Sequence, residues 1–416
     1  MYSTRSAYAL LPTVAQCGAR PAKRRCLSSS STTRTTKNSV EPPYKILFFG
    51  ADKFSCVTLE TLYEARQDLI EHLVVVTPPD QRTGRRLKEV HRPPLRILAE
   101  SLSIPSIALP PSLLKDWSPP PEFFPSSSSS SSSPLPNSLL LTASFGHLLP
   151  TSLLSLFLPL NALNLHPSML PKYRGAAPIQ WGVINGDSDR NWRGSREGEL
   201  EGGMGVTVQE LSRGKFDRGR ILGQERVHVP EGADFLTLEP ILARNGGQLL
   251  VKILRDLSSY QTNAKPQDPS LATSAPKLTK QTARIDWEKM TAMQITRLQR
   301  GVGHQYPLWT TIPSTTDAPT QLQLLLSPTP ATLSLSDFSS PPPPGSLFFN
   351  PRDKAIYIAT LSSTTKDGPV ENEGKVEAVK VEKVKKEGGK WIDSKEWWNG
   401  IKRSALISVE GWVKVE

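Results

Sequence analysis

Residues 45–77 place a helix between two apolar runs, and this order is the feature that most restricts the fold. The run KILFFG ends at Gly50 and is followed by ADKFSCVTLETLYEARQ, whose apolar residues recur at helical spacing, and then by LVVVT. Short uninterrupted apolar runs are typical of strands that are buried on both faces of a parallel sheet. A helix between them makes the connection that parallel pairing requires. The sequence therefore predicts an α/β domain with a doubly wound, mostly parallel sheet.

The first strand-to-helix turn argues against a dinucleotide cofactor. It holds a single glycine, Gly50, and no G-x-G-x-x-G pattern follows. That pattern lets the backbone approach a pyrophosphate, so its absence disfavours a nicotinamide or flavin role.

The same alternation of elements continues to residue 258. Further strands are predicted within SLLLTASFGHLLP, LNALNLHPSMLP, GVTVQEL and GRILGQERVHV, and further helices within LRILAESLSIP, AAPIQWGVING and residues 234–258. Two polar stretches, near 118–137 and near 188–203, interrupt this pattern, and the first contains eight consecutive serines from Ser126 to Ser133. We interpret both as disordered surface insertions in a domain that spans residues 41–258.

A second domain is predicted after a polar, proline-containing linker at residues 259–275. Residues 276–416 hold short strand-like runs, such as PLWTTI and AIYIAT, and few helices, which indicates a small β-barrel of the OB-like kind. A Pro- and Ser-rich insertion is expected near 312–344. The stretch KVEAVKVEKVKKEGGK fits either a solvated surface or a nucleic-acid-binding face.

The N-terminal 40 residues have the composition of a mitochondrial import peptide. They carry seven Lys or Arg and no Asp or Glu, which is most of the net charge of +11 of the whole chain. The alternative is a disordered basic tail. Only Cys56 of three cysteines falls outside this segment, and no run of eighteen apolar residues occurs, so neither a disulfide framework nor a membrane span is expected.

A candidate catalytic pair stands in LNLHPSMLPKYRGAAP. Asn164 and His166 are two residues apart in a predicted strand, so they project to one face at its carboxyl end, where α/β sheets bind ligands. An amide N–H and an imidazole together suit stabilisation of an oxyanion in acyl or formyl transfer. Asp217, in the Gly-flanked turn GKFDRGRIL, is a candidate partner for the histidine. A loop histidine and an ordinary turn aspartate are the alternatives.

Taken together, six segments resemble the methionyl-tRNA formyltransferases of the folate-dependent formyltransferase group. They are KILFFGADKFS, VVVTPPDQRTGRRLK, ASFGHLLP, LNLHPSMLPKYRGAAPIQWGVINGD, GVTVQEL and FDRGRILGQE. A weaker resemblance in APKLTKQTARIDW, PGSLFFNPRDKAIYIAT and WWNGIKR covers the second domain. The resemblance implies the formyltransferase fold, with a catalytic domain at residues 41–258 and a tRNA-binding β-barrel domain at residues 276–416.

The resemblance also implies roles for single residues. The catalytic trio would be Asn164, His166 and Asp217. The folate site would include Ser168, Met169, Leu170, Pro171, Phe145 and Leu148. The basic loop that reaches the tRNA acceptor end would contribute Arg82, Arg85, Arg86 and Lys88, although GRRLKE replaces the usual Gly-Arg-Gly pattern.

The implied reaction moves the formyl group of 10-formyltetrahydrofolate to the α-amino group of initiator methionyl-tRNA, with no metal. We expect a monomer in the mitochondrial matrix that starts organellar translation. The alternatives are a formyltransferase that acts on glycinamide ribonucleotide or an amino sugar, and a catalytically dead RNA-binding relative.

Overall fold

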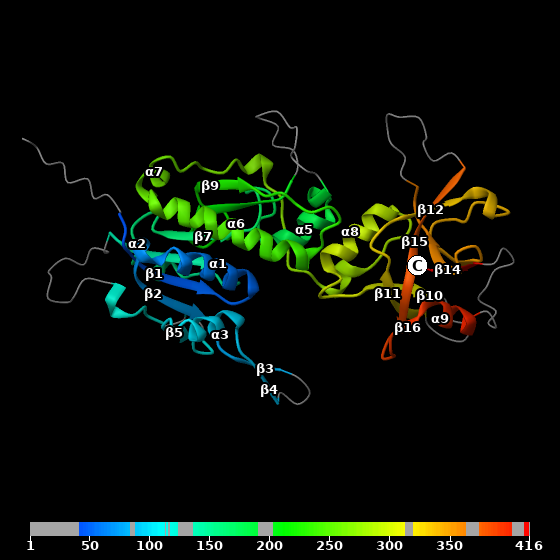
Figure 1. Ribbon diagram of the computed structural model, residues 1–416, viewed down its shortest axis with the longest axis horizontal. Coiled ribbons are helices and arrows are strands. Elements are labelled where there is room, and N and C mark those ends of the chain that lie inside the picture. Colours follow the sequence, from blue (N-terminus) through cyan, green and yellow to red (C-terminus); the bar gives the residue numbers. More distant parts are fainter. Residues whose placement is uncertain are drawn as a thin grey trace, which may run out of the picture. The chain divides into compact units, whose positions relative to one another are not determined.

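The computed structural model describes residues 41–83, 88–112, 114, 117–123, 136–189, 203–312, 319–362, 374–401 and 412–415. One sheet organises the part up to residue 262, and a second sheet organises the part from about residue 277 (Figure 1). The predicted import peptide at 1–40, and most of the insertions predicted near 118–137 and 188–203, lie outside the described residues.

Seven strands form the first sheet in the order β5-β2-β1-β6-β7-β8-β9. They are β1 (Tyr44–Gly50), β2 (Ile70–Thr77), β5 (Ser106–Ala108), β6 (Ser138–Ala143), β7 (Ala162–His166), β8 (Gly205–Glu210) and β9 (Ile221–Arg226). Pairing is parallel from β5 to β7, and antiparallel where β8 joins β7 and β9 joins β8. The predicted mostly parallel α/β domain is confirmed.

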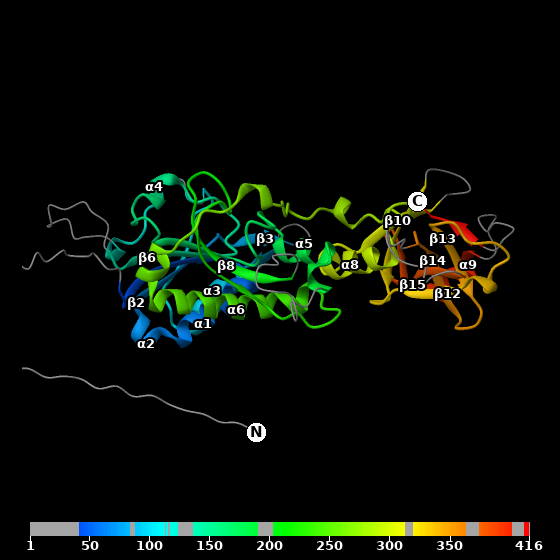
Figure 2. The same ribbon diagram turned by 90° about the horizontal axis from the view of Figure 1, so that it is seen from above.

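Helices cover both faces of this sheet. They are α1 (Lys53–Glu64), α2 (Arg66–Leu69), α3 (Pro94–Ser101), α4 (Thr151–Leu154), α5 (Pro178–Ile184), α6 (Phe235–Arg255) and α7 (Leu257–Thr262). The views in Figures 1 and 2 show α1 and α6 side by side on one face and α4 on the other. Strand alternation decides which side chain faces which layer: Ile46 and Phe48 of β1 join the core with α1 and α6, whereas Leu47 and Phe49 join the core with α4.

Aspartate side chains cap the N-termini of α1 and α6. The Asp52 side chain accepts from Ser55 N at 3.2 Å at the start of α1, and Asp234 accepts from Thr237 N at 2.9 Å at the start of α6. Such caps satisfy backbone donors that the helix itself leaves unpaired. At the far end of α6, Tyr44 on β1 donates its hydroxyl proton to the carbonyl of Leu254, 3.0 Å away.

The second sheet is antiparallel in every pairing. Its strands are β10 (Leu308–Ile312), β11 (Thr320–Leu326), β12 (Ala331–Ser334), β13 (Ser346–Asn350), β14 (Ala355–Ala359), β15 (Lys375–Lys386), β16 (Ile392–Asp393) and β17 (Trp412–Lys414). It packs with α8 (Ala292–Val302) and α9 (Ser394–Ile401) around one apolar core. A separate hairpin of β3 (Gln81–Thr83) and β4 (Glu89–His91) follows β2.

Three stretches differ from the sequence-based expectation. Within the first predicted insertion, Pro121–Phe123 forms a 3-10 turn that buries Phe123 completely, because an aromatic ring so near the sheet gains from leaving water. The stretch near 312–344 contains β11 and β12. The lysine-rich stretch is the long strand β15, in which Val379, Val381 and Val384 face the core while most of the lysines are exposed.

Candidate active site

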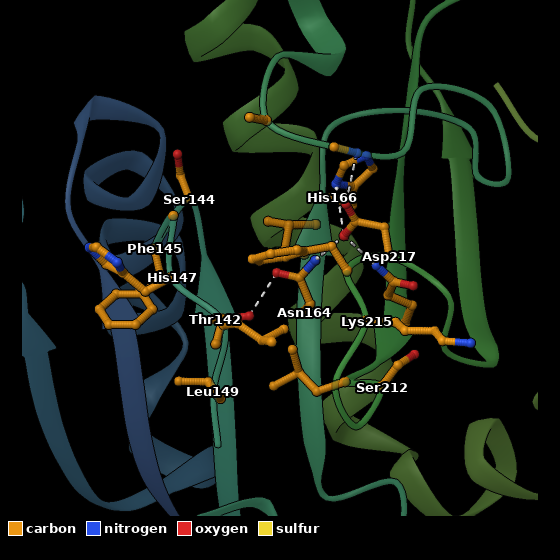
Figure 3. A pocket seen from close by; sticks show the side chains of 18 of the residues that line it. Thr142, Ser144, Phe145, His147, Leu149, Asn164, His166, Ser212, Lys215 and Asp217 are labelled. Atoms are coloured by element: carbon orange, nitrogen blue, oxygen red, sulfur yellow. Dashed lines mark hydrogen bonds and ion pairs between the residues drawn. The ribbon is translucent and has the colours of Figure 1, made fainter. Parts of the chain in front are cut away.

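Asn164 and His166 extend from the carboxyl end of β7 to the same face of the sheet. Their neighbours Leu163 and Leu165 pack in the core beneath α6, so the strand period turns the two polar side chains to the opposite face, as predicted. His166 is buried, with 4% of its surface exposed. Figure 3 shows both side chains directed toward Asp217.

The imidazole of His166 has a defined proton position. Its Nε2 lies 2.9 Å from the carbonyl oxygen of Tyr173. Because a carbonyl can only accept, Nε2 carries the hydrogen, and Nδ1 is the nitrogen that can gain or lose a proton. Nδ1 lies 3.5 Å from Oδ1 of Asp217, so the carboxylate forms an ion pair with the ring when the ring is charged.

Asp217 is the centre of this cluster. Its Oδ1 accepts from Gln209 Nε2 at 3.0 Å and faces Asn164 Nδ2 at 3.4 Å, and its Oδ2 accepts from the backbone N–H of Gly175 at 2.9 Å. Only 8% of the side chain is exposed. The residue has a left-handed backbone with φ of 53°, an uncommon conformation that is often found at functional sites.

Two glycines permit the turns that bring these groups together. Gly175 has φ of 129°, and a Cβ placed there would lie 2.6 Å from the carbonyl oxygen of Ala275. At Gly219, just after Asp217, a Cβ would lie 1.7 Å from the Glu210 carbonyl oxygen. Neither position accommodates a side chain without moving the backbone that carries Asp217 or its donor.

A row of three side chains across neighbouring strands fixes the amide of Asn164. Thr142 on β6 and Gln209 on β8 are the register partners of Asn164. Thr142 Oγ1 donates to Asn164 Oδ1 at 2.7 Å, which leaves the amide NH₂ on the side of Asp217. Sequence reasoning missed Thr142, Gln209 and the Tyr173 carbonyl. The available signal was the one polar residue in LLLTA and the polar residues that alternate with valines in GVTVQ.

These residues form one wall of a cavity of about 330 Å³, a volume in the usual range of small-molecule sites. Phe145 and Leu148, predicted from the resemblance as folate contacts, line it, and so do Ser144, Ala176 and Lys215 (Figure 3). The sequence-predicted trio is therefore brought together beside a ligand-sized space.

The other four residues predicted to bind folate lie elsewhere. Met169, Leu170 and Pro171 line a second cavity of about 670 Å³, on the side of β9 and α7. Ser168 is 2% exposed, and its hydroxyl donates to the carbonyl of Lys172 at 2.7 Å. This short segment shapes the turn after β7 and is not part of the wall that carries His166.

The predicted basic loop corresponds to the β3–β4 hairpin. Arg82 lies in β3 and Lys88 directly precedes β4, and both are exposed. Arg85 and Arg86 lie outside the described residues. Neither Arg82 nor Lys88 is among the residues that line the cavity at His166.

A second carboxylate, Asp52, is hydrogen-bonded to the loop that carries Phe145. Asp52 accepts a hydrogen bond from the hydroxyl of Ser144, which has a left-handed backbone and begins that loop. Burial raises the pKa of the Asp52 carboxyl above its ordinary value, while the Ser144 hydrogen bond acts in the opposite direction.

Two kinds of feature are absent from the part of the chain that is described. Within it, no three His, Cys, Asp or Glu side chains are grouped as they would be around a metal ion. None of its helices combines the length and apolar character that crossing a bilayer requires.

Comparison with known proteins identifies the family. The mitochondrial methionyl-tRNA formyltransferase of Bos taurus is 33% identical over 274 residues, which are 65% of this chain and 60% of that protein. The methionyl-tRNA formyltransferase of Syntrophus aciditrophicus is 35% identical over 244 residues, which are 59% of this chain and 68% of that protein. The chain thus spans about 60% of the length of the mammalian relative. Residues 44–254 match the formyl transferase family and residues 277–402 match its C-terminal domain, so this chain belongs to the formyl transferases.

Proposed function

We propose that this chain transfers the formyl group of 10-formyltetrahydrofolate to the α-amino group of methionyl-tRNA. The observation that carries the proposal is the convergence of Asn164, His166 and Asp217 on one edge of a ligand-sized cavity in a formyl transferase. The names of the mammalian and bacterial relatives support methionyl-tRNA as the acceptor. Acceptors such as glycinamide ribonucleotide or an amino sugar, and a role in RNA binding alone, are less favoured.

The chemical step begins with attack of the neutral amine on the formyl carbon. A free α-amino group has a pKa of roughly 7.7 to 8.0, so a useful neutral fraction exists near pH 8. As the new C–N bond forms, the formyl oxygen becomes an oxyanion. Asn164 Nδ2 is the donor for that oxygen because Thr142 holds the other end of its amide, and one such donor is worth about 3 kcal/mol.

Breakdown of the tetrahedral intermediate needs a proton on the folate nitrogen. The amine loses one proton and the N10 atom of the folate gains one as its bond to the formyl carbon breaks. His166 is suited to move this proton through Nδ1, because Nε2–H is held by the Tyr173 carbonyl. Asp217, facing Nδ1 at 3.5 Å, keeps the ring in place and stabilises it while it is charged.

The formyl donor would lie against Phe145 and Leu148 in the cavity beside His166. In this proposal Ser168, Met169, Leu170 and Pro171 contribute to the folate site indirectly. They set the course of the turn whose Tyr173 carbonyl and Gly175 N–H hold the catalytic groups.

Recognition of the tRNA would combine the predicted basic loop, with Arg82, Arg85, Arg86 and Lys88, and the C-terminal domain. On that domain Lys380, Lys383 and Lys386 of β15 are exposed and available for phosphate contacts. We further propose that its antiparallel sheet is an OB-like barrel, that the protein is a monomer, and that residues 1–40 direct it to the mitochondrial matrix.

The first test is formylation of purified methionyl-tRNA by residues 41–416 with 10-formyltetrahydrofolate. We expect formyl-methionyl-tRNA with the wild type and at least a hundredfold lower kcat with His166→Ala. His228→Ala, at an exposed histidine beside β9, is the control and should keep its rate. Formylation of glycinamide ribonucleotide or a nucleotide-linked amino sugar, without formylation of methionyl-tRNA, would overturn the proposed acceptor. Binding of tRNA without any formyl transfer would favour the RNA-binding alternative.

A matched pair of substitutions tests which cavity holds the donor. Ala176→Trp would partly fill the cavity beside His166, and Leu271→Trp would partly fill the larger one. Both positions are exposed, so each variant should fold. We expect Ala176→Trp to raise the KM for the formyl donor at least tenfold and Leu271→Trp to change it less than twofold. The reverse result would assign the donor to the cavity beside Met169 and Pro171.

A further inference from the structure

The segment between the two domains is hydrogen-bonded to β9 and to the turn after β7, beside the candidate active site. At one end Lys265 and Ile221 of β9 exchange backbone hydrogen bonds of 3.0 and 2.7 Å. At the other end Arg174 N donates to Thr273 O at 2.9 Å, and Ala275 N donates to Arg174 O at 2.7 Å. Residues 265–275, predicted as a linker, therefore run beside the turn that follows β7.

Gln267, in the middle of this segment, uses both ends of its side-chain amide. Nε2 lies 3.0 Å from Gln209 Oε1, 3.1 Å from the Asp217 carbonyl oxygen and 2.9 Å from the Gly219 carbonyl oxygen. Oε1 accepts from the Arg174 guanidinium, through Nε at 3.0 Å and Nη2 at 2.7 Å. The reversed orientation would set an oxygen against three acceptors and an NH₂ against a cation, so the partners allow only one orientation.

These contacts reach the proposed catalytic groups from two sides. Gln209 Nε2 donates to Oδ1 of Asp217. Because Gln267 donates to the oxygen of the same amide, the Gln209 side chain is fixed with its NH₂ group toward Asp217. Arg174 lies between Tyr173, whose carbonyl accepts from His166 Nε2, and Gly175, whose N–H donates to Asp217. One side chain thus touches the supports of both catalytic groups.

Gln267 itself stands outside the catalytic cavity. It is absent from the residues that line the space beside His166 and lines the larger neighbouring cavity instead. The turn that it holds is costly to form, since Asp217 has a left-handed backbone. The hydrogen bonds from Gln267 to the carbonyl oxygens of Asp217 and Gly219 support this turn from elsewhere in the chain.

From these contacts we infer that Gln267 is a positioning residue. It keeps the side chains of Asp217 and His166 in fixed positions relative to each other, through its contacts with Gln209 and Arg174. The inference rests on the proposed roles of Asp217 and His166. It means that the connection between the two domains is also a part of the catalytic framework, and that its geometry affects the formyl-transfer step.

Gln267→Ala, with Gln261→Ala as the matched control, tests this role in the full chain. Gln261 is also a half-buried glutamine with two side-chain hydrogen bonds, to Leu160 O and Asn161 Oδ1, but its partners do not contact the catalytic groups. We expect kcat to fall about tenfold to hundredfold in Gln267→Ala, with the KM of both substrates changed less than threefold, since small displacements of catalytic groups have effects of this size. Gln261→Ala should keep kcat, with a similar shift in melting temperature. Equal kcat losses in the two variants would overturn the role.

Two further readouts separate positioning from general destabilisation. Because Gln267 acts partly through Gln209, the double variant with Gln209→Ala should lose less activity than the product of the two single losses, whereas independent residues would give the full product. Gln267→Glu keeps the acceptor for Arg174 but replaces the donor toward three oxygens, so its kcat should be no higher than that of Gln267→Ala.

The last readout requires no acceptor and therefore separates this inference from the proposed function. The ¹⁵N chemical shifts of the His166 ring report which nitrogen carries the proton, and they should change in Gln267→Ala but not in Gln261→Ala. Unchanged shifts would overturn the inference even if the wild type formylates methionyl-tRNA. Changed shifts in a protein that does not formylate methionyl-tRNA would uphold it and refute the proposed function.

Discussion

The carboxylate of Asp217 and a second group of carboxylates, formed by Asp52 and Glu239, have opposite surroundings. Asp217 is surrounded by donors: an N–H of Gln209, the backbone N–H of Gly175, and the side chains of Asn164 and His166 beyond them. Asp52 and Glu239 lie near the start of α1, where burial raises the pKa of both carboxyls and raises that of Glu239 to about 6.

The carboxylates of the second group also raise the pKa of neighbouring acidic groups. The charge of Asp52 adds to the effect of burial on Glu239, and burial together with these two carboxylates and Glu60 raises the pKa of the Cys56 thiol to about 12. Lys53 opposes the effect on Glu239. A carboxylate ringed by donors can hold a fixed negative charge beside a reacting group, whereas half-buried carboxylates near one another reduce stability. Three substitutions test this distinction.

The largest effect is expected from Asp217→Asn. The amide would set an NH₂ group against either Gln209 Nε2 or Gly175 N, and it would hold no charge opposite His166. We expect kcat for formyl transfer to fall about 10²- to 10³-fold. Steady-state kinetics with both substrates measures this, and KM should change much less than kcat.

Asp268→Asn is the matched control for that variant. Asp268 is exposed, accepts from Ser270 and lines the larger cavity, so its replacement should leave kcat within twofold. A threefold or smaller loss of kcat in Asp217→Asn would show that the ring of donors around Asp217 serves the fold and not the reaction.

How far the sequence predicts this arrangement depends on the range of the interaction. Asn164 and His166 could be placed on one face because the period of a strand is local. Asp217 was found through its Gly-flanked turn and the family resemblance. Thr142 and Gln209 are visible as polar residues in predicted strands, but their contact with Asn164 could not be predicted, because it depends on the register of three strands that are far apart in the chain.

Backbone groups and misleading composition account for the remaining differences. The carbonyl of Tyr173 and the N–H of Gly175 carry no sequence signal, since every residue except proline has both groups. The strand β15 was hidden because its lysines suggested a charged surface and because its valines, at spacings of three, two and three residues, do not follow the strand period. Gln267 was assigned to a linker because its segment is polar and contains proline, and its five contacts depend on the folded turn at Asp217.

A smaller effect is expected from Asp52→Ala, which removes two interactions of the second group. The helix α1 loses its N-cap, which costs about 1 kcal/mol of unfolding free energy. Ser144 loses the acceptor of its hydroxyl, so the loop with Phe145 and Leu148 should be less well fixed. We therefore expect both a lower melting temperature and a threefold to tenfold higher KM for the formyl donor.

Asp234→Ala separates these two consequences. Asp234 caps α6 in the same way, by accepting from Thr237 N, and among the described residues it has no hydrogen bond to Ser144, which bonds to Asp52 instead. It should lower the melting temperature by a similar amount and leave the donor KM unchanged. If the two variants have the same KM, the contact between Asp52 and Ser144 has no part in donor binding.

The smallest effect is expected from Glu239→Gln, and it should depend on pH. The ordinary pKa of 4.5 applies in the unfolded chain, whereas the folded value is about 6, so the folded state binds the proton more tightly. The stability that this proton contributes is present below pH 4.5 and is lost as the pH rises to about 6. Because Glu239 is only half-buried, solvent screening should limit the loss to under about 1 kcal/mol.

Melting curves from pH 4 to pH 8 should show the stability of Glu239→Gln rising relative to that of the wild type between pH 4.5 and about 6, and a constant difference above that range. The exposed Glu231→Gln should show no such gain, and an equally stable or less stable Glu239→Gln at pH 7 would mean that the carboxylates at α1 are as well compensated as Asp217.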